Sequence, residues 1–307
     1  MPRAGHFLAY CLLRLVFCLA QALPLSACRW GSRVLATVFC DVLRVRRRIT
    51  DENLRHAFPE MNAAQRRWLA WRMWEHLFLF GAEVAQARRK LRGGNYWHYI
   101  KFVGEAEFTR ALLSERPLIL VTAHFGNFEL ASQVIALFGH PLYSVARPLD
   151  NPYLDRFIND LRAGCGQTML SKQSDYERIL DLLAAGATVS FVADQYAGTK
   201  GCWVEFFNRP ASAHKAIALL ALQHQAPIVV GYCQRRGGPL EYELVLQGTF
   251  DPRTAEPTLN SVKQVTQWFT HEFETMIRRR PEQYWWLHRR WKDNRARRRQ
   301  VRAAKAA

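Results

Sequence analysis

Short apolar runs alternate with amphipathic stretches through the second half of the chain. Continuous apolar runs bounded by turn residues are typical of strands buried on both faces, whereas apolar positions three or four apart are typical of helices. On this basis the pattern predicts strands at 117–123, 141–147, 167–171, 187–194, 226–234 and 242–248, separated by helices at 126–139, 151–166, 174–186 and 213–225. Strands and helices that alternate in this way predict an α/β fold, with a mixed, largely parallel sheet flanked by helices.

The region before residue 99 has a helical pattern instead. Asn62 can cap a helix through 63–91, whose apolar positions Leu69, Met73, Leu77, Phe80 and Val84 recur at helical spacing. The tryptophans at 68, 71 and 74 on this helix have two readings, as core residues or as residues at a membrane surface.

The N-terminal segment 7–28 is about as long as a bilayer crossing requires, although Arg14, Gln21 and Pro24 interrupt it. It has no evident cleavage site, which favours an uncleaved anchor or an interfacial helix over a signal peptide. A helix packed on the protein's own body is the alternative. We therefore divide the chain into a membrane-associating segment at 1–47, a main domain at 48–292 and a basic tail at 293–307.

Charge and cysteine content indicate the kind of partner and the cellular compartment. The 307 residues carry a formal net charge of +17, and residues 278–307 hold ten of those excess charges. A concentrated basic surface implies an anionic partner, such as membrane headgroups, phosphorylated lipid, acidic protein or nucleic acid. The seven cysteines are odd in number and scattered, which indicates a reducing compartment without a disulfide framework. If segment 7–28 spans a membrane, the basic residues after it place the rest of the chain in the cytoplasm.

One polar pair interrupts the predicted passage from a buried strand into a helix at "VTAHFGNFEL", residues 121–130. His124 ends the strand, and Glu129 on the first helical turn is expected to hold one ring nitrogen as N–H, leaving the other free to accept a proton. No GxSxG nucleophile turn is present, so the pair fits activation of a hydroxyl on a substrate. The simpler alternative is a buried, hydrogen-bonded histidine.

"HFGNFE" matches the H-x4-D/E motif of the glycerolipid acyltransferase superfamily, and the surrounding sequence resembles the late lipid A biosynthesis acyltransferase family. The resemblance extends from about residue 48 to 292 and includes "NLRHAFPEM", "ARPLDNPYLDRFINDLRAGCG", "VADQYAG", "WVEFFNRPASAHKAIALLALQHQAPIVVGY" and "PEQYWWLHRRWK". Several blocks in the family's order are far more specific than a single short motif.

The resemblance implies a reaction and a set of residues. His124 is then the general base, and Glu129 orients it. An acyl thioester is the donor, carried by acyl carrier protein or coenzyme A, and no metal or other cofactor is needed. The resemblance implies substrate-binding roles for five further residues: Arg147, which matches the arginine that contacts acceptor phosphate, Asp194, Lys172, Arg209 and Asn127. For Arg147 the alternative is a surface ion pair, and for Asp194 a structural role at a turn.

Two departures from the family pattern leave the acceptor open. Tyr196 stands in "DQYAG" where many relatives carry an acidic residue, and Lys172 stands where relatives often carry arginine. Lysine keeps the charge but lacks the planar fork of arginine. A lipid A precursor, a lysophospholipid and another hydroxylated lipid all remain as acceptors, at the cytoplasmic face of a bacterial inner membrane.

Two other functions also account for parts of the sequence. A non-enzymatic protein could bind membranes or nucleic acid through the basic C-terminal region, but a polybasic segment beside a membrane anchor favours anionic lipid, and we expect no nucleic acid partner. An esterase could use the same histidine on water. An apolar groove of acyl length that excludes water would favour transfer instead.

Overall fold

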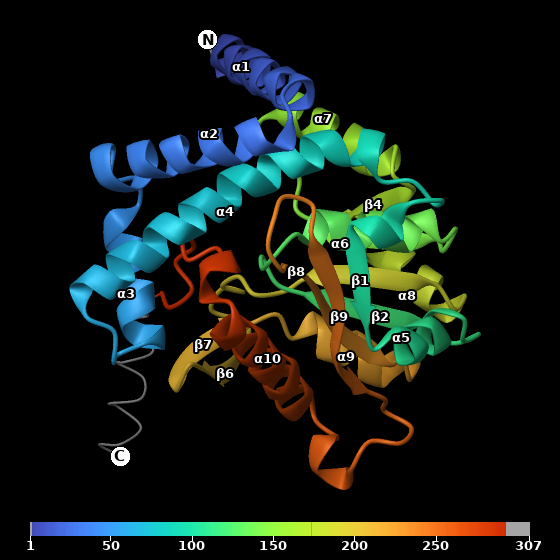
Figure 1. Ribbon diagram of the computed structural model, residues 1–307. Coiled ribbons are helices and arrows are strands. Elements are labelled where there is room, and N and C mark those ends of the chain that lie inside the picture. The colour runs from blue at the N-terminus through green and yellow to red at the C-terminus, as the bar shows by residue number, and fades with distance from the viewer. Residues whose placement is uncertain (1, 173, 293–307) are drawn as a thin grey trace.

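The computed structural model describes residues 2–172 and 174–292, which form a mixed sheet flanked by helices (Figure 1). The main sheet has seven strands in the order β1-β9-β8-β2-β5-β3-β4. All neighbouring strands are parallel except β8 and β9, which are antiparallel. The strands are β1 (Ile100–Val103), β2 (Leu118–Thr122), β3 (Leu142–Ala146), β4 (Gln167–Ser171), β5 (Thr188–Val192), β8 (Ile228–Arg235) and β9 (Tyr242–Phe250). The predicted mixed, largely parallel α/β sheet is therefore confirmed.

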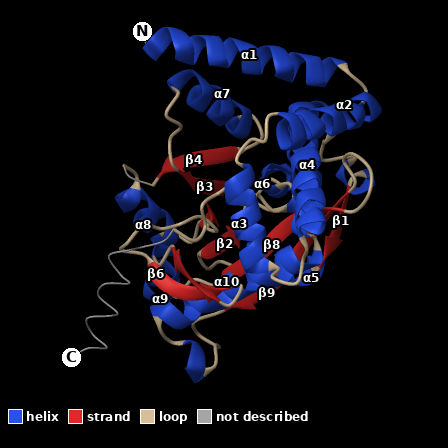
Figure 2. Cartoon of the chain, turned by 90° about the vertical axis from the view of Figure 1, so that its left-hand side faces the viewer, coloured by secondary structure: helices blue, strands red, loops and turns tan. Residues whose placement is uncertain are grey.

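Helices cover both faces of this sheet, and long helices pack against one end of it (Figure 2). They are α1 (Pro2–Ala22), α2 (Leu25–Thr37), α3 (Arg47–Ala57), α4 (Ala63–Lys90), α5 (Glu105–Leu112), α6 (Phe128–Leu137), α7 (Pro152–Ala163), α8 (Tyr176–Ala184), α9 (Ala216–His224) and α10 (Val262–Arg279). Short helical turns lie at Val38–Val42, Tyr96–His98, Pro257–Leu259 and Pro281–Gln283.

Alternate residues of each central strand face different helices, as the pleat requires. Leu118 and Leu120 of β2 pack in one apolar cluster with α5 and α6, whereas Ile119 and Val121 pack with α8, α9 and α10 in the other. Apolar runs without alternation are the expected signature of strands buried on both faces. The continuous apolar runs therefore predict that helices cover both faces of the sheet.

The strands that the pattern did not predict are short or carry polar residues. β1 has four residues at the edge of the sheet, with only Ile100 buried. The separate hairpin of β6 (Cys202–Phe206) and β7 (Arg209–Ala213) turns through Phe207 and Asn208, which both have positive φ. Neither segment has the continuous apolar run on which the predictions relied. The predicted cap at Asn62 is confirmed, because its side chain forms a reciprocal capping box with Gln65 at the start of α4.

The first helix is long and apolar enough to cross a membrane, by length and composition alone, over Ala4–Ala22. One side of α1 packs on α7 through ring contacts of Tyr10 with Tyr153 and of Phe17 with Phe157. Its other side is apolar and open to solvent, with more than half of the surface exposed at Leu8, Leu12, Leu15, Val16 and Leu19. The predicted basic tail at 293–307 lies outside the described residues.

Candidate active site

His124 and Asp194 meet at the carboxyl edge of the sheet because their strands are parallel neighbours in matching register. β2 pairs with β5 so that Thr122 lies opposite Val192, and each polar residue follows its strand by two positions. His124 Nδ1 lies 2.7 Å from Asp194 Oδ1. Functional side chains gather at this edge in open α/β sheets.

The charge state of Asp194 fixes the tautomer of its partner. The Asp194 side chain is 1% exposed. Burial alone would raise the pKa of this carboxyl, but the charge of His124 and its hydrogen bonds lower that pKa more, and the net result lies well below the usual range. An ionised carboxylate only accepts hydrogen bonds, so His124 Nδ1–H is the donor, and in the neutral form of the ring Nε2 carries the free lone pair.

Three aromatic rings enclose His124. Its ring centroid lies 5.3 Å from that of Phe128, 5.1 Å from that of Trp285 and 5.1 Å from that of His288. The backbone N–H of Trp285 also donates to the His124 carbonyl at 3.1 Å. The C-terminal segment, distant in sequence, therefore builds one wall of the site.

The turn after His124 depends on a glycine and a buried histidine. Gly126 has φ +58°, and an added Cβ would collide with the Cys233 carbonyl. The Gly126 carbonyl accepts a hydrogen bond from His76 Nε2 at 3.1 Å. Burial lowers the pKa of His76 to about 3, with a smaller contribution from the charge of Arg235, so His76 is neutral at physiological pH.

Asn127, for which the resemblance implied substrate binding, is fully buried. Its side-chain oxygen accepts from the backbone N–H of Leu130 at 3.1 Å, which caps α6, and its amide donates to Tyr242 Oη at 3.4 Å. Both groups of the side chain therefore serve the fold. The structure shows Asn127 holding the turn, and the substrate-binding role that the resemblance implied stays a prediction.

A buried carboxylate on α4 supports the same turn. Glu83 is ion-paired with Arg235 of β8, and it accepts hydrogen bonds from the Leu240 N–H at 2.7 Å and the Tyr242 hydroxyl at 2.5 Å. A buried charge is tolerated when it is paired and hydrogen-bonded in this way. The network ties α4 to β8 and β9 beside Asn127.

Glu129 has a different partner from the one predicted. Arg162 of α7 donates to its carboxylate twice, at 2.5 Å from Nη2 and 3.1 Å from Nε. The expected hydrogen bond between Glu129 and His124 is thus replaced by two separate pairs, His124 with Asp194 and Glu129 with Arg162. The reason is geometric, since Asp194 lies on the neighbouring strand at the level of His124, whereas Glu129 is on α6 facing α7.

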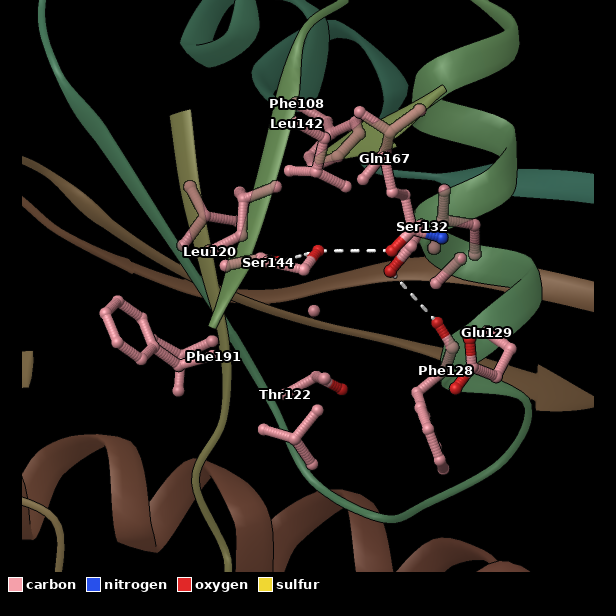
Figure 3. A pocket seen from close by; sticks show the side chains of 18 of the residues that line it. Phe108, Leu120, Thr122, Phe128, Glu129, Ser132, Leu142, Ser144, Gln167 and Phe191 are labelled. Carbon is pink, nitrogen blue, oxygen red and sulfur yellow. Dashed lines mark hydrogen bonds between the residues drawn. The ribbon is translucent and has the colours of Figure 1, made fainter. Parts of the chain in front are cut away.

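An apolar cavity lies between the sheet and α6 (Figure 3). Its lining includes Phe128, Glu129 and Arg162, together with apolar side chains such as Phe108, Leu120, Ile135, Leu142, Phe191 and Leu244. Phe128 lines the cavity and also contacts His124, so this one side chain links the histidine to the cavity. Ser144, Gln167 and Ser190 add polar groups to the lining of the cavity. The Ser144 hydroxyl donates to Gln167 Oε1 at 3.1 Å and lies 2.8 Å from Ser190 Oγ.

The remaining predicted residues do not join the histidine pair: Arg147 and Lys172 follow strands of the main sheet, and Arg209 lies in the separate hairpin. Arg147 follows β3, is largely exposed and pairs with Asp150 at 2.8 Å, which is the surface ion pair considered as its alternative. Lys172 follows β4, with its Nζ 3.2 Å from His214 Nδ1. Arg209 begins β7. Asp194, predicted to bind substrate or to shape a turn, is instead the hydrogen-bond partner of His124.

Sequence reasoning did not assign Arg162, Trp285 or Phe128 to the site. Arg162 and Trp285 lie in segments that bore the family resemblance, but nothing in their spacing indicates a contact with Glu129 or His124. A signal for Asp194 was available: two predicted buried strands both end in an ionisable residue, and parallel neighbours bring such ends together.

Comparison with known proteins identifies the family. The family model described as bacterial lipid A biosynthesis acyltransferase matches residues 2–293. The chain is similar to a lipid A biosynthesis lauroyltransferase of Escherichia coli K12, with 26% identity over 81% of this chain and 80% of the relative. It is also similar to a lipid A biosynthesis palmitoleoyltransferase of the same organism, with 25% identity over 86% of this chain and 84% of the relative.

A solved 1-acyl-sn-glycerophosphate acyltransferase from Thermotoga maritima matches at 14% identity, over 81% of this chain and 95% of that one, with a TM-score of 0.34. That likeness is too low to bear on function. The family model, by contrast, spans nearly the whole chain. The chain therefore belongs to the bacterial lipid A biosynthesis acyltransferase family and is an O-acyltransferase.

Proposed function

We propose that this protein moves a fatty acyl chain from a thioester, carried by acyl carrier protein, to a hydroxyl group of a lipid A precursor, with His124 as general base. One observation carries the proposal: His124 is held by Asp194 and contacts Phe128, which lines an apolar cavity. A base with a free lone pair next to a site for a hydrocarbon chain suits acyl transfer to an alcohol.

The side chains of His124 and Asp194 account for every proton transfer in the proposed reaction. His124 Nε2 takes the proton of the acceptor hydroxyl as its oxygen attacks the thioester carbonyl. The tetrahedral intermediate collapses with loss of the carbon–sulfur bond, and the imidazolium returns its proton to the departing sulfur. Asp194 holds the ring in place and stabilises the imidazolium while the charge exists. The products are an ester and a free thiol.

The cavity is the proposed site for the acyl chain. Its apolar lining would bury the hydrocarbon, each methylene contributing about 0.8 kcal/mol. Glu129 and Arg162 also line it, and they neutralise each other in a partly buried pair, so no lone charge faces the chain. Excluding water from this space would favour transfer over hydrolysis of the thioester.

The exposed apolar side of α1 supports membrane association. A helix that packs one face on α7 and presents leucines on the other fits an interfacial helix as well as an anchor. We place the catalytic domain at the cytoplasmic side of a bacterial inner membrane, where carrier-protein thioesters and a lipid acceptor would meet.

Mass spectrometry of the products tests the function directly. Purified wild type and His124→Ala are each given acyl carrier protein thioester with a lipid A precursor, with lysophospholipid or with water alone. We expect an acylated lipid A precursor from wild type only. Product from lysophospholipid alone would change the acceptor, free fatty acid without lipid product would indicate an esterase, and equal product from both proteins would remove His124 from the mechanism.

A further inference from the structure

A second hollow in the surface, which shares no lining residue with the apolar cavity, is lined in part by His288, whose ring contacts that of His124. Three segments that are far apart in sequence line it: Arg46 and Ile49 from the start of α3, Gln195 and Tyr196 after β5, and His288, Arg289 and Lys292 near the C-terminus. We refer to this hollow as the basic groove.

The charged side chains that line the basic groove are all positive. Its lining holds three cations, Arg46, Arg289 and Lys292, and no carboxylate. All three are exposed, and within the described ranges none forms an ion pair with a carboxylate. Arg116 and Arg162, by contrast, each face an acid. Like charges gathered in a hollow raise the local concentration of anions.

Hydrogen bonds fix the backbone of the segments that line the groove. The amide of buried Asn53 donates to the carbonyls of Trp286 at 2.7 Å and His288 at 2.6 Å. Buried Arg290 donates to the Ser212 carbonyl at 2.7 Å. Arg46 adopts a left-handed backbone, with φ +52°, and donates to the Leu287 carbonyl at 3.0 Å. A non-glycine residue keeps such a backbone only where its surroundings enforce it.

The groove reaches the histidine pair through His288 and Gln195. The His288 ring lies 5.1 Å from the His124 ring, and Gln195 Nε2 lies 3.3 Å from His288 Nε2. Gln195 directly follows Asp194 in the chain. His124 therefore contacts one lining residue of the apolar cavity, Phe128, and one lining residue of the basic groove, His288.

We propose that the basic groove binds a phosphate group of a substrate and so holds that substrate near His124, on the side where His288 lies. This inference rests on the proposed acyl transfer. Arginine and lysine are the residues that bind phosphate in proteins, and an exposed groove admits a headgroup that an apolar cavity rejects. The phosphate belongs either to the acceptor lipid or to the phosphodiester through which a pantetheine thioester is joined to its carrier.

A double variant, Arg289→Gln with Lys292→Gln, removes two of the three groove charges. Its matched control, Arg110→Gln with Arg253→Gln, removes the same charge from exposed positions on α5 and after β9. Circular dichroism and thermal unfolding establish that each variant is folded. KM and kcat are then measured with phosphorylated and dephosphorylated acceptor, and with acyl thioesters on carrier protein and on pantetheine that lacks phosphate.

If the acceptor supplies the phosphate, KM for the phosphorylated acceptor rises roughly ten- to a hundredfold in the groove variant, as expected for lost charge-assisted hydrogen bonds, and KM for the dephosphorylated acceptor does not change. If the donor supplies it, the rise appears with the carrier-protein thioester and is absent with the phosphate-free thioester. The control variant should match wild type in every case.

Kinetics equal to wild type with all substrates would overturn the proposal, and so would an equal loss with phosphorylated and phosphate-free substrates. If wild type forms no acylated product, the proposed acyl transfer fails while the groove is still tested by calorimetric titration of phosphorylated acceptor in detergent micelles. Binding that is lost in the groove variant alone supports the phosphate site, and equal binding by both rejects it.

Discussion

His124 Nδ1 lies 2.7 Å from Asp194 Oδ1, although 70 residues separate the two in the chain. The contact follows from sheet register, since β2 and β5 are parallel neighbours and both residues follow their strands by two positions. Both residues lie just beyond the ends of two paired central strands, which fix the positions of their backbones. Asp194, rather than Glu129, therefore takes the orienting role in the proposed mechanism.

The first prediction concerns this pair. Asp194→Asn preserves shape but presents an amide that can favour the wrong ring tautomer of His124, so kcat should fall about a thousandfold or more, by analogy with serine hydrolases. His124→Ala should cost a factor of about a hundred to ten thousand. Steady-state kinetics with carrier-protein thioester measures both. An Asp194→Asn protein that is folded and as fast as wild type would refute the orienting role.

The second prediction is that Glu129 forms a stabilising ion pair with Arg162 rather than acting on His124. Arg162→Met or Glu129→Gln alone leaves one partly buried charge without its partner and should lower the free energy of unfolding by about 1–3 kcal/mol, while the double variant should recover part of that loss. Urea unfolding in detergent measures the cycle. Additive losses would show that the two side chains do not act as a pair.

The third prediction concerns acyl length. Ser190 faces the cavity four residues before Asp194, which places it about 13 Å deeper along the strand at roughly 3.3 Å per residue. Ser190→Leu should fill the cavity there and shift the preferred donor to shorter chains, whereas Ser190→Ala should leave the preference unchanged. Competition among carrier-protein thioesters of different lengths, resolved by mass spectrometry, reads out the shift. An unchanged profile for Ser190→Leu would place the acyl chain elsewhere.

The fourth prediction concerns acid stability. The unfolded chain protonates His76 near pH 6.5, whereas the folded protein keeps it neutral down to about pH 3. Between these values the unfolded state binds the extra proton, so stability is lost as pH falls, by at most about 1.4 kcal/mol per pH unit from this residue. His76→Gln can still donate to the Gly126 carbonyl and should show a shallower loss. Urea midpoints from pH 7 to 4.5 that fall in parallel for both proteins would exclude this contribution.

The fifth prediction concerns the membrane. Leu12→Glu on the open side of α1 should remove about 1.5–3 kcal/mol of apolar burial and shift protein from the membrane pellet to the soluble fraction. Leu113→Glu changes an even more exposed leucine just after α5 and should have no such effect. Sedimentation with anionic vesicles gives the comparison. Equal partitioning of the two variants would argue against α1 as the membrane contact.

Much of the fold was predictable because it follows from local pattern. Buried strands such as β2 and β5 need apolar side chains on both faces, so their runs stand out, and the Asn62 capping box is a local device. The edge strand β1 and the β6–β7 hairpin lack that signal, since short strands with polar residues are stabilised by packing that sequence periodicity does not report.

By itself, the sequence determined the alternation of elements, the position of His124 at a strand end and the family to which these motifs point. The tertiary structure alone decided the partners. Strand order placed β5 on one side of β2 and β8 on the other; β5 gave His124 its carboxylate from Asp194, and Glu129 was left to Arg162. The tertiary structure also packs the C-terminal segment against the start of α3, and this packing creates the basic groove. The reason is that hydrogen bonds and charge pairs reach only a few ångströms, so which residues meet depends on three-dimensional packing rather than on spacing along the chain.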